Sequence, residues 1–241
     1  MHQRLIRHLT DDNDSFNSRY GGGWLSPDRK HFYVSIPKNA SSFLGTWLTE
    51  NGWDIFNFKD VNTFDQETGF HQLESVVVVL RDPIERFISG FAQYVKGNIL
   101  YPLFSDDDRP FTIEDVRQHW PAIERIMADV GPFFDDHTWP QYYYHEDILP
   151  HIPRKMFWLN PNHLERLFMK EFGLEPASDE ARANANRAVD QDEIMTQIQE
   201  LIKGTLKNLD YLHKLRKEFA PDYEVINSTK FIFHNALNHD K

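Results

Sequence analysis

The sequence predicts an α/β fold in which a central parallel sheet is flanked by helices and the C-terminal half is mostly helical. Residues 31–36 (HFYVSI) and 75–80 (SVVVVL) are short apolar runs typical of strands, and each precedes a loop and an amphipathic helix. Apolar residues later recur at helical spacing, at Ile194, Ile198, Leu201, Ile202, Leu209, Leu212 and Leu215. Two strand–loop–helix units predict a doubly wound sheet, which binds ligands at the carboxyl ends of its strands.

The first half of the chain supplies most of this sheet. We expect an irregular N-terminal arm at residues 1–30, which are polar and glycine-rich, followed by a single domain at residues 31–241. After the first strand, residues 41–50 predict a short helix that ends at Asn51-Gly52. Residues 53–58 then predict a second strand.

The most strand-like segment, residues 75–80, is a continuous β-branched run that suits a central strand covered on both faces. Asp82 and Pro83 follow it, and they are residue types typical of a helix N-cap and of the first helical position. We therefore expect a helix to begin directly after this strand.

The remaining elements are predicted to be mainly helical. Residues 111–130 predict one helix or two, with Pro121 as the break. Residues 139–147 are a further helical candidate, residues 155–159 a short strand, and residues 160–172 a helix that Gly173 stops.

The composition limits the possible partners. The 241 residues carry 26 basic and 37 acidic side chains, a net charge of −11, whereas a nucleic-acid partner requires a broad basic face. The longest purely apolar run, residues 76–80, is far shorter than the ~20 residues of a membrane span. We therefore expect no nucleic-acid partner and no membrane insertion. The absence of cysteine excludes disulfides and thiolate sites and favours a cytoplasmic location.

The first predicted strand runs into the loop PKNASSF at residues 37–43. Lys38 adds a mobile positive charge there, and Ser41 and Ser42 place hydroxyl groups at the start of the helix. The first N–H groups of a helix have no backbone partner and bind anions. The loop is not a Walker A motif, because it lacks the glycines and its lysine stands at the front. Taken alone, a capped helix beside a solvated lysine explains this loop equally well.

The strand at residues 75–80 leads into RDPIERFISGF. Arg81 stands where this strand emerges, and Ser89 lies two helical turns into the next segment. The planar guanidinium fork of arginine suits phosphate oxygens. Taken alone, Arg81 could instead pair with a nearby acid, and Ser89 could merely face a neighbouring helix.

Together, PKNASSF and RDPIERFISGF resemble the two donor-binding motifs of the sulfotransferase superfamily, in particular its carbohydrate branch. The first is similar to the 5′-phosphosulfate loop of that family, and the second to its 3′-phosphate segment, R-D-P-x-x-R-x-x-S. The match is close over residues 32–48 and 76–95 and loose elsewhere. It implies a P-loop-like nucleotide-binding fold, the donor 3′-phosphoadenosine 5′-phosphosulfate (PAPS), and 3′-phosphoadenosine 5′-phosphate (PAP) as the product.

The resemblance also implies a role for each matching residue. Lys38 would be catalytic and bind the bridging and sulfuryl oxygens. Arg81 and Ser89 would hold the 3′-phosphate, and Arg86 would be structural. The 5′-phosphate would be wrapped by the backbone and hydroxyl groups of Asn39, Ala40, Ser41, Ser42 and Phe43. No metal is expected, because Lys38 and the helix N-terminus would neutralise the developing charge.

The acceptor side is less defined. In this superfamily the base is usually a histidine or glutamate between the two motifs, and His71 is our candidate because a histidine of ordinary pKa suits proton abstraction at neutral pH. Glu67 is the main rival. Farther along, FFDDHTWPQ resembles a downstream segment of the carbohydrate branch, so His137 and Gln141 are candidates for contacting the acceptor. An acceptor with a free hydroxyl is required, and a carbohydrate is favoured.

Two other functions stay open. The first is a P-loop kinase or NTPase, which would need Walker A glycines and an aspartate that holds magnesium at a strand end. The second is a non-catalytic nucleotide-binding module that keeps only the fold. The sequence does not determine the oligomeric state.

Overall fold

The computed structural model describes residues 22–57, 72–104, 112–146, 149, 151–160, 163–186 and 193–237. The chain divides into two compact units. The first unit comprises Met1–Ile36, Ala40–Val79 and Tyr144–Ala181, and the second comprises Pro37–Asn39, Leu80–Tyr143 and Arg182–Lys241. Residues 1–21 of the expected N-terminal arm lie outside the described residues.

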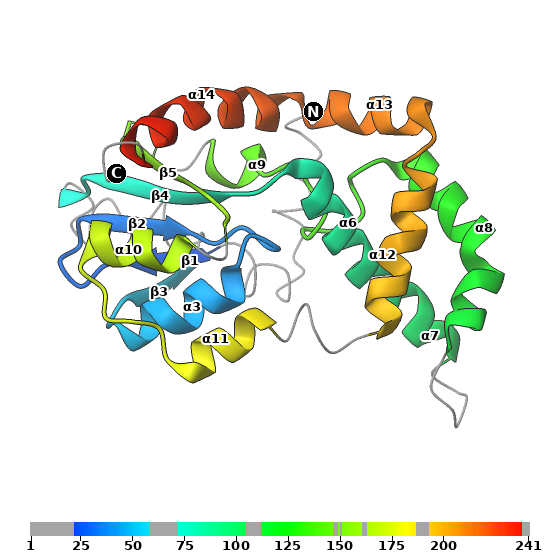
Figure 1. Ribbon diagram of the computed structural model, residues 1–241, viewed down its shortest axis with the longest axis horizontal. Coiled ribbons are helices and arrows are strands. Elements are labelled where there is room, and N and C mark those ends of the chain that lie inside the picture. Colours follow the sequence, from blue (N-terminus) through cyan, green and yellow to red (C-terminus); the bar gives the residue numbers. More distant parts are fainter. Residues whose placement is uncertain are drawn as a thin grey trace. The chain divides into compact units, whose positions relative to one another are not determined.

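The first unit contains a five-stranded sheet, with the strand order β3-β1-β2-β4-β5 (Figure 1). Its strands are β1 (Gly22–Leu25), β2 (His31–Val34), β3 (Asp54–Asn57), β4 (Ser75–Leu80) and β5 (Arg154–Trp158). β2 and β4 run parallel, with Phe32 opposite Val76 and Tyr33 opposite Val77. All six residues of β4 are buried, as its β-branched sequence predicts. The carboxyl ends of β2 and β4 therefore lie at the same edge of the sheet.

The sheet is mixed, which corrects the prediction of a parallel sheet. β1 pairs antiparallel with both β2 and β3. Residues 22–25 were expected to be part of an irregular arm, and instead they form this strand. A Cβ atom at Gly23 would lie 2.1 Å from the carbonyl oxygen of Tyr33 and 2.6 Å from the ring of Phe32. Glycine at this position permits a close backbone approach within the sheet.

Helices α3 (Ser41–Glu50) and α10 (Leu164–Phe172) also belong to the first unit. Phe168 of α10 packs against Trp47 of α3, Tyr33 of β2 and Phe157 of β5, with ring centroids 4.7–6.5 Å apart. Both helices were predicted, and α10 ends at Gly173, whose positive φ of 66° suits a helix C-cap. An aromatic cluster thus joins these helices to the sheet.

The second unit is mostly helical, as predicted for the later part of the chain. Helices α6, α8, α12 and α13 bury their apolar faces in one core, to which Phe87, Phe91, Ile123, Ile198 and Leu215 contribute. The helical elements of this unit are α6 (Pro83–Tyr94), η2 (Val95–Leu100), α7 (Tyr101–Phe104), α8 (Ile113–Val130), α12 (Glu193–Thr205), α13 (Leu209–Glu218) and α14 (Ala220–Leu237). Helices α9 (Tyr142–His145) and α11 (Asp179–Asn186) each span the division between the units. In Figure 1, α12 runs alongside α6, with which it is in contact.

Two predictions about helix boundaries have different outcomes. Asp82 is the N-cap of α6, with its carboxylate accepting from Ile84 N and Glu85 N, and Pro83 is the first helical residue, as predicted. α8, in contrast, continues through Pro121 without a break. Its buried stripe, Val116, Trp120, Ile123 and Met127, extends on both sides of the proline, and this packing outweighs the single backbone hydrogen bond that proline removes. None of the helices in the described ranges is long and apolar enough to span a bilayer.

Candidate anion-binding site

The loop after β2 and the end of β4 meet in the second unit. Nη1 of Arg81, the residue directly after β4, lies 3.4 Å from the carbonyl oxygen of Lys38, to which it donates. This contact follows from the topology, because β2 and β4 are parallel neighbours and their carboxyl ends share one edge. The residues that the sequence singled out as an anion-binding pair are thus in contact.

The loop has an unusual backbone. Lys38 and Ala40 both have positive φ angles, of 69° and 60°. A left-handed conformation costs a residue with a side chain roughly 1–2 kcal/mol, and such strain is concentrated at functional sites. Asn39, between them, is fully buried.

Lys38 is mostly buried, and burial lowers the pKa of its ammonium group to about 8. The positive charges of Arg81 and Arg86 lower it further, and Asp135 and Asp136 act in the opposite direction. Among the described residues, the ammonium group of Lys38 has no hydrogen-bond or ion-pair partner. Burial also lowers the pKa of Arg81. Desolvated cations of this kind are stabilised by a bound anion.

Gln141 forms hydrogen bonds with both the loop after β2 and the residue that follows β4. Its Oε1 accepts from the backbone N–H of Arg81 at 2.9 Å and from Nδ2 of Asn39 at 2.5 Å. Its Nε2 donates to the carbonyl oxygen of Arg81 at 2.8 Å. The side chain is fully buried. A single amide therefore holds both backbone polar groups of Arg81 and the side chain of the loop residue Asn39.

Gln141 is held in turn by Asp222 of α14. The carboxylate of Asp222 accepts from the backbone N–H groups of Gln141, at 2.9 Å, and of Tyr142, at 2.7 Å. Burial raises the pKa of Asp222 to about 6, against the lowering effects of its hydrogen bonds with Gln141 and of the charge of Arg86. Sequence reasoning missed Asp222. Asp222 stands between the apolar residues Phe219 and Ile226, which indicates that its carboxylate is buried but does not identify its partners.

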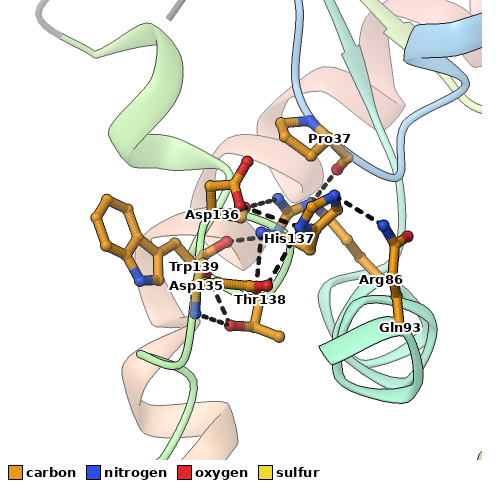
Figure 2. A network of polar contacts seen from close by, with 8 residues as sticks. All are labelled: Pro37, Arg86, Gln93, Asp135, Asp136, His137, Thr138 and Trp139. Atoms are coloured by element: carbon orange, nitrogen blue, oxygen red, sulfur yellow. Dashed lines mark hydrogen bonds and ion pairs between the residues drawn. The ribbon is translucent and has the colours of Figure 1, made fainter. Parts of the chain in front are cut away.

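Arg86 fixes the other side of the loop (Figure 2). Its side chain is 1% exposed, and its Nε donates to the carbonyl oxygen of Pro37 at 2.8 Å. Its terminal nitrogens donate to the carbonyl oxygens of Trp139 and Asp136. All three acceptors are backbone groups, so the arginine joins α6 to two loops, in keeping with the structural role that the resemblance implies.

The segment 135–138 forms a compact polar cluster beside Arg86 (Figure 2). Nδ1 of His137 lies 3.3 Å from Asp135 Oδ2 and 3.0 Å from Asp136 Oδ1. Burial alone would lower the pKa of His137, but its hydrogen bonds to Asp135 and Asp136 outweigh that effect and raise it. A Cβ atom at Gly90 of α6 would lie 2.1 Å from the carbonyl oxygen of His137, so glycine permits the close approach of α6.

The side chains of Asp135, Asp136 and His137 could hold a metal ion, since their ligand atoms lie within 4.8 Å of one another. The contacts between the imidazole and the two carboxylates already account for this proximity. The cluster is therefore no evidence for a metal, and the absence of a metal stays a prediction.

In the first unit, the start of α3 has the features of an anion-binding helix end. The N-cap Ala40 provides no side-chain hydrogen bond to the first turn. The hydroxyls of Ser41 and Ser42 make no hydrogen bond to another residue of the described ranges, and the same is true of Ser89 in the second unit. The N–H groups and hydroxyls at this helix end are suited to phosphate or sulfate oxygens.

Several predicted residues remain without a structural test. His71 and Glu67, the candidate bases, lie outside the described residues. His137 and Gln141 are described, but their contacts are with the protein itself, and the amide of Gln141 makes three hydrogen bonds. Within the second unit, two desolvated cations at a strand edge could bind an anionic group.

No family model matches this chain, and neither the curated proteins nor the solved structures contain a significant match to it.

Proposed function

We propose that the protein is a sulfotransferase that transfers a sulfuryl group from PAPS to an acceptor hydroxyl, with a carbohydrate favoured as the acceptor. The observation that carries the proposal is the contact between Arg81 and the carbonyl oxygen of Lys38. The two segments that resemble the donor-binding motifs come from different parts of the chain, and each places its charged residue at this point. Such a pair of cations suits a donor with phosphate groups at both the 5′ and 3′ positions.

In the proposed reaction, the acceptor oxygen forms a bond to sulfur, the bond between sulfur and the bridging phosphate oxygen breaks, and PAP leaves. Lys38 would stabilise the charge that develops on the bridging and sulfuryl oxygens, as a preorganised cation in a poorly solvated environment. Arg81 and Ser89 would bind the 3′-phosphate, and residues 39–43 the 5′-phosphate. The proton of the acceptor would pass to a base, for which His71 is our candidate and Glu67 the rival.

The role of Asp82 favours this proposal over a magnesium-dependent NTPase. An NTPase would use an aspartate near a strand end to hold magnesium. Oδ1 of Asp82 instead accepts from Ile84 N and Glu85 N, each at 3.0 Å, and so caps α6. A non-catalytic nucleotide-binding module would share the donor contacts and differ only in lacking transfer activity.

The finer aspects of the proposal rest on the sequence. These are the P-loop-like character of the fold, the cytoplasmic location and the carbohydrate acceptor, all of which stay predictions. The contacts of His137 and Gln141 favour roles in positioning other groups, and their predicted contact with the acceptor is untested.

Two experiments test the function. In thermal-shift measurements, PAP should stabilise the protein, by about 2.7 kcal/mol at a concentration 100 times its dissociation constant, and ATP with magnesium should have little effect. Stabilisation by ATP with magnesium alone would favour the NTPase. A transfer assay with radiolabelled PAPS and a panel of sugar acceptors then separates an enzyme from a binding module.

The same assay tests the base. His71→Ala should abolish transfer and leave PAP binding nearly unchanged, and His151→Ala, at an exposed position, serves as the control. Near-normal transfer by His71→Ala would remove that assignment and leave Glu67 to be tested.

A further inference from the structure

We infer that Gln141 is a positioning residue that sets the spacing of Lys38 and Arg81, and that Asp222 of the last helix holds Gln141 in place for this purpose. The inference rests on the proposed function for its consequences in donor binding. Neither residue would touch the donor. Their effect would pass through the backbone of Arg81 and the side chain of Asn39.

The hydrogen bonds of Gln141 form a specific pattern. Its amide pairs with the N–H of Arg81 at 2.9 Å and with the carbonyl oxygen of the same residue at 2.8 Å. A neighbouring strand would pair with both groups of one residue in a similar way, so the amide extends the ladder of β4 by one residue. The backbone of Arg81 is thereby fixed just where its side chain leaves the sheet.

The same amide reaches the loop. Its Oε1 also accepts from Nδ2 of Asn39 at 2.5 Å, and Asn39 is the residue that follows Lys38. Loss of the amide would leave one donor on each segment, and the carbonyl oxygen of Arg81, without this partner, and unpaired polar groups of this kind are unfavourable. The distance between the loop and Arg81 would then no longer be defined by a common partner.

Asp222 completes the chain of contacts. Its two carboxylate oxygens accept from consecutive backbone N–H groups, those of Gln141 and Tyr142. Asp222 is 3% exposed, and burying a carboxylate without a structural purpose is costly. The two hydrogen bonds offset part of this cost, and they fix the backbone from which the amide of Gln141 extends. Asp222 and Gln141 thus link helix α14 to Asn39 and Arg81 of the proposed donor site.

The test compares the affinities for PAP and for AMP, which lacks the 3′-phosphate that Arg81 would bind. Gln141→Met is close in shape and removes all three hydrogen bonds of the amide. At a temperature well below unfolding, we expect it to reduce the affinity for PAP at least 10-fold and the affinity for AMP by a smaller factor, because AMP would lose only the effect on the 5′-phosphate loop. Gln118→Met, at an exposed position of α8, is the matched control and should change neither affinity. An unchanged ratio of PAP to AMP affinity in Gln141→Met would overturn the inference.

A conservative variant separates positioning from general destabilisation. In Gln141→Glu, the protonated carboxylic acid has an acceptor and a donor, as the amide does, whereas the carboxylate has no donor for the carbonyl oxygen of Arg81. The PAP affinity of Gln141→Glu, relative to wild type at the same pH, should therefore recover as the pH falls from 8 to 5.5. A constant relative affinity over this range would contradict the assigned pattern of hydrogen bonds.

A third measurement does not depend on the proposed function. Hydrogen exchange of the Arg81 amide should be at least 10-fold faster in Gln141→Met and in Asp222→Asn than in wild type, and unchanged in Gln118→Met. If wild type binds no PAP, the proposed function is wrong, and the exchange rate alone decides the positioning role. Unchanged exchange at Arg81 in both variants would overturn that role.

Discussion

Nε of Arg86 donates to the carbonyl oxygen of Pro37 at 2.8 Å, while the terminal nitrogens of the same guanidinium donate to Trp139 and Asp136. The residue immediately before Lys38 is therefore fixed to α6 by a fully buried cation. Arginine donates to the three carbonyl oxygens from three separate nitrogens, whereas all three N–H donors of a lysine start from one nitrogen and would not reach the same positions.

Arg86→Lys should consequently destabilise the protein by about 2–4 kcal/mol, because buried carbonyl groups would lose their donors. Urea unfolding measures this change. Arg125→Lys, at an exposed position of α8, provides a control that should stay within about 0.5 kcal/mol of wild type. Equal stabilities for the two variants would show that the network around Pro37 contributes little.

Gly90→Ala tests the packing of α6 against the segment 135–138. The added Cβ would lie 2.1 Å from the backbone carbonyl oxygen of His137, and a Cβ has no rotatable bond that could relieve the clash, so one of the segments must move. A loss of about 1–3 kcal/mol is expected. At Gly204 of α12 a Cβ would meet nothing within 4 Å, so Gly204→Ala should instead stabilise the protein by roughly 0.5–1 kcal/mol. Opposite signs in thermal unfolding would confirm both expectations, and a neutral Gly90→Ala would contradict the close contact.

Lys38 should take up protons when an anion binds. Its pKa of about 8 in the folded protein lies below the ordinary value because burial disfavours the charged form, and a bound phosphosulfate group would reverse that effect. At pH 8 about half of the molecules would carry the proton before binding, so PAP binding should take up about 0.5 proton at Lys38. Calorimetric titration in two buffers of different ionisation enthalpy measures this uptake, against Lys38→Arg, which stays charged. Identical proton uptake by wild type and Lys38→Arg would contradict the role of Lys38.

Asp222 should make the stability of the protein depend on pH. Because its pKa is raised from 3.8 to about 6 in the folded state, the folded protein binds the proton more tightly than the unfolded chain does. The stability from this group is complete below about pH 4 and is lost as the pH rises through 6. Between pH 5 and pH 7, wild type should lose about 1 kcal/mol more than Asp222→Asn does. Parallel stability profiles in urea unfolding would show that Asp222 is not desolvated as described.

The sequence predicted those features that depend on neighbouring residues. Ser41–Glu50 and Ser75–Leu80 are a helix and a strand with the predicted bounds, and Asp82 caps α6, because capping chemistry and apolar patterns are local signals. β1 was not predicted. Its glycines were interpreted as part of an irregular arm, whereas Gly23 lies in a strand, where a side chain would clash with the carbonyl oxygen of Tyr33 on the neighbouring strand.

In the candidate site, too, some contacts could be predicted from sequence patterns and others could not. The contact of Arg81 with Lys38 could be anticipated from two parallel strands whose ends carry cations. The role of Asp222 could not, since its partners are the backbone N–H groups of Gln141 and Tyr142, which any residues at those positions would offer. A partner of this kind leaves no trace in the identity of the residues around it.

Calorimetric titration of PAP and of AMP into wild type and Arg81→Ala tests most directly whether the two strand ends hold one bisphosphorylated nucleotide. Wild type should bind PAP at least 10-fold more tightly than AMP, since one charge-assisted phosphate contact is worth about 1.5–3 kcal/mol. Arg81→Ala should weaken PAP binding by roughly 2–4 kcal/mol and remove most of that preference, with Arg125→Ala unchanged. Equal affinities of wild type for PAP and AMP, or a preference for PAP that survives in Arg81→Ala, would contradict the account.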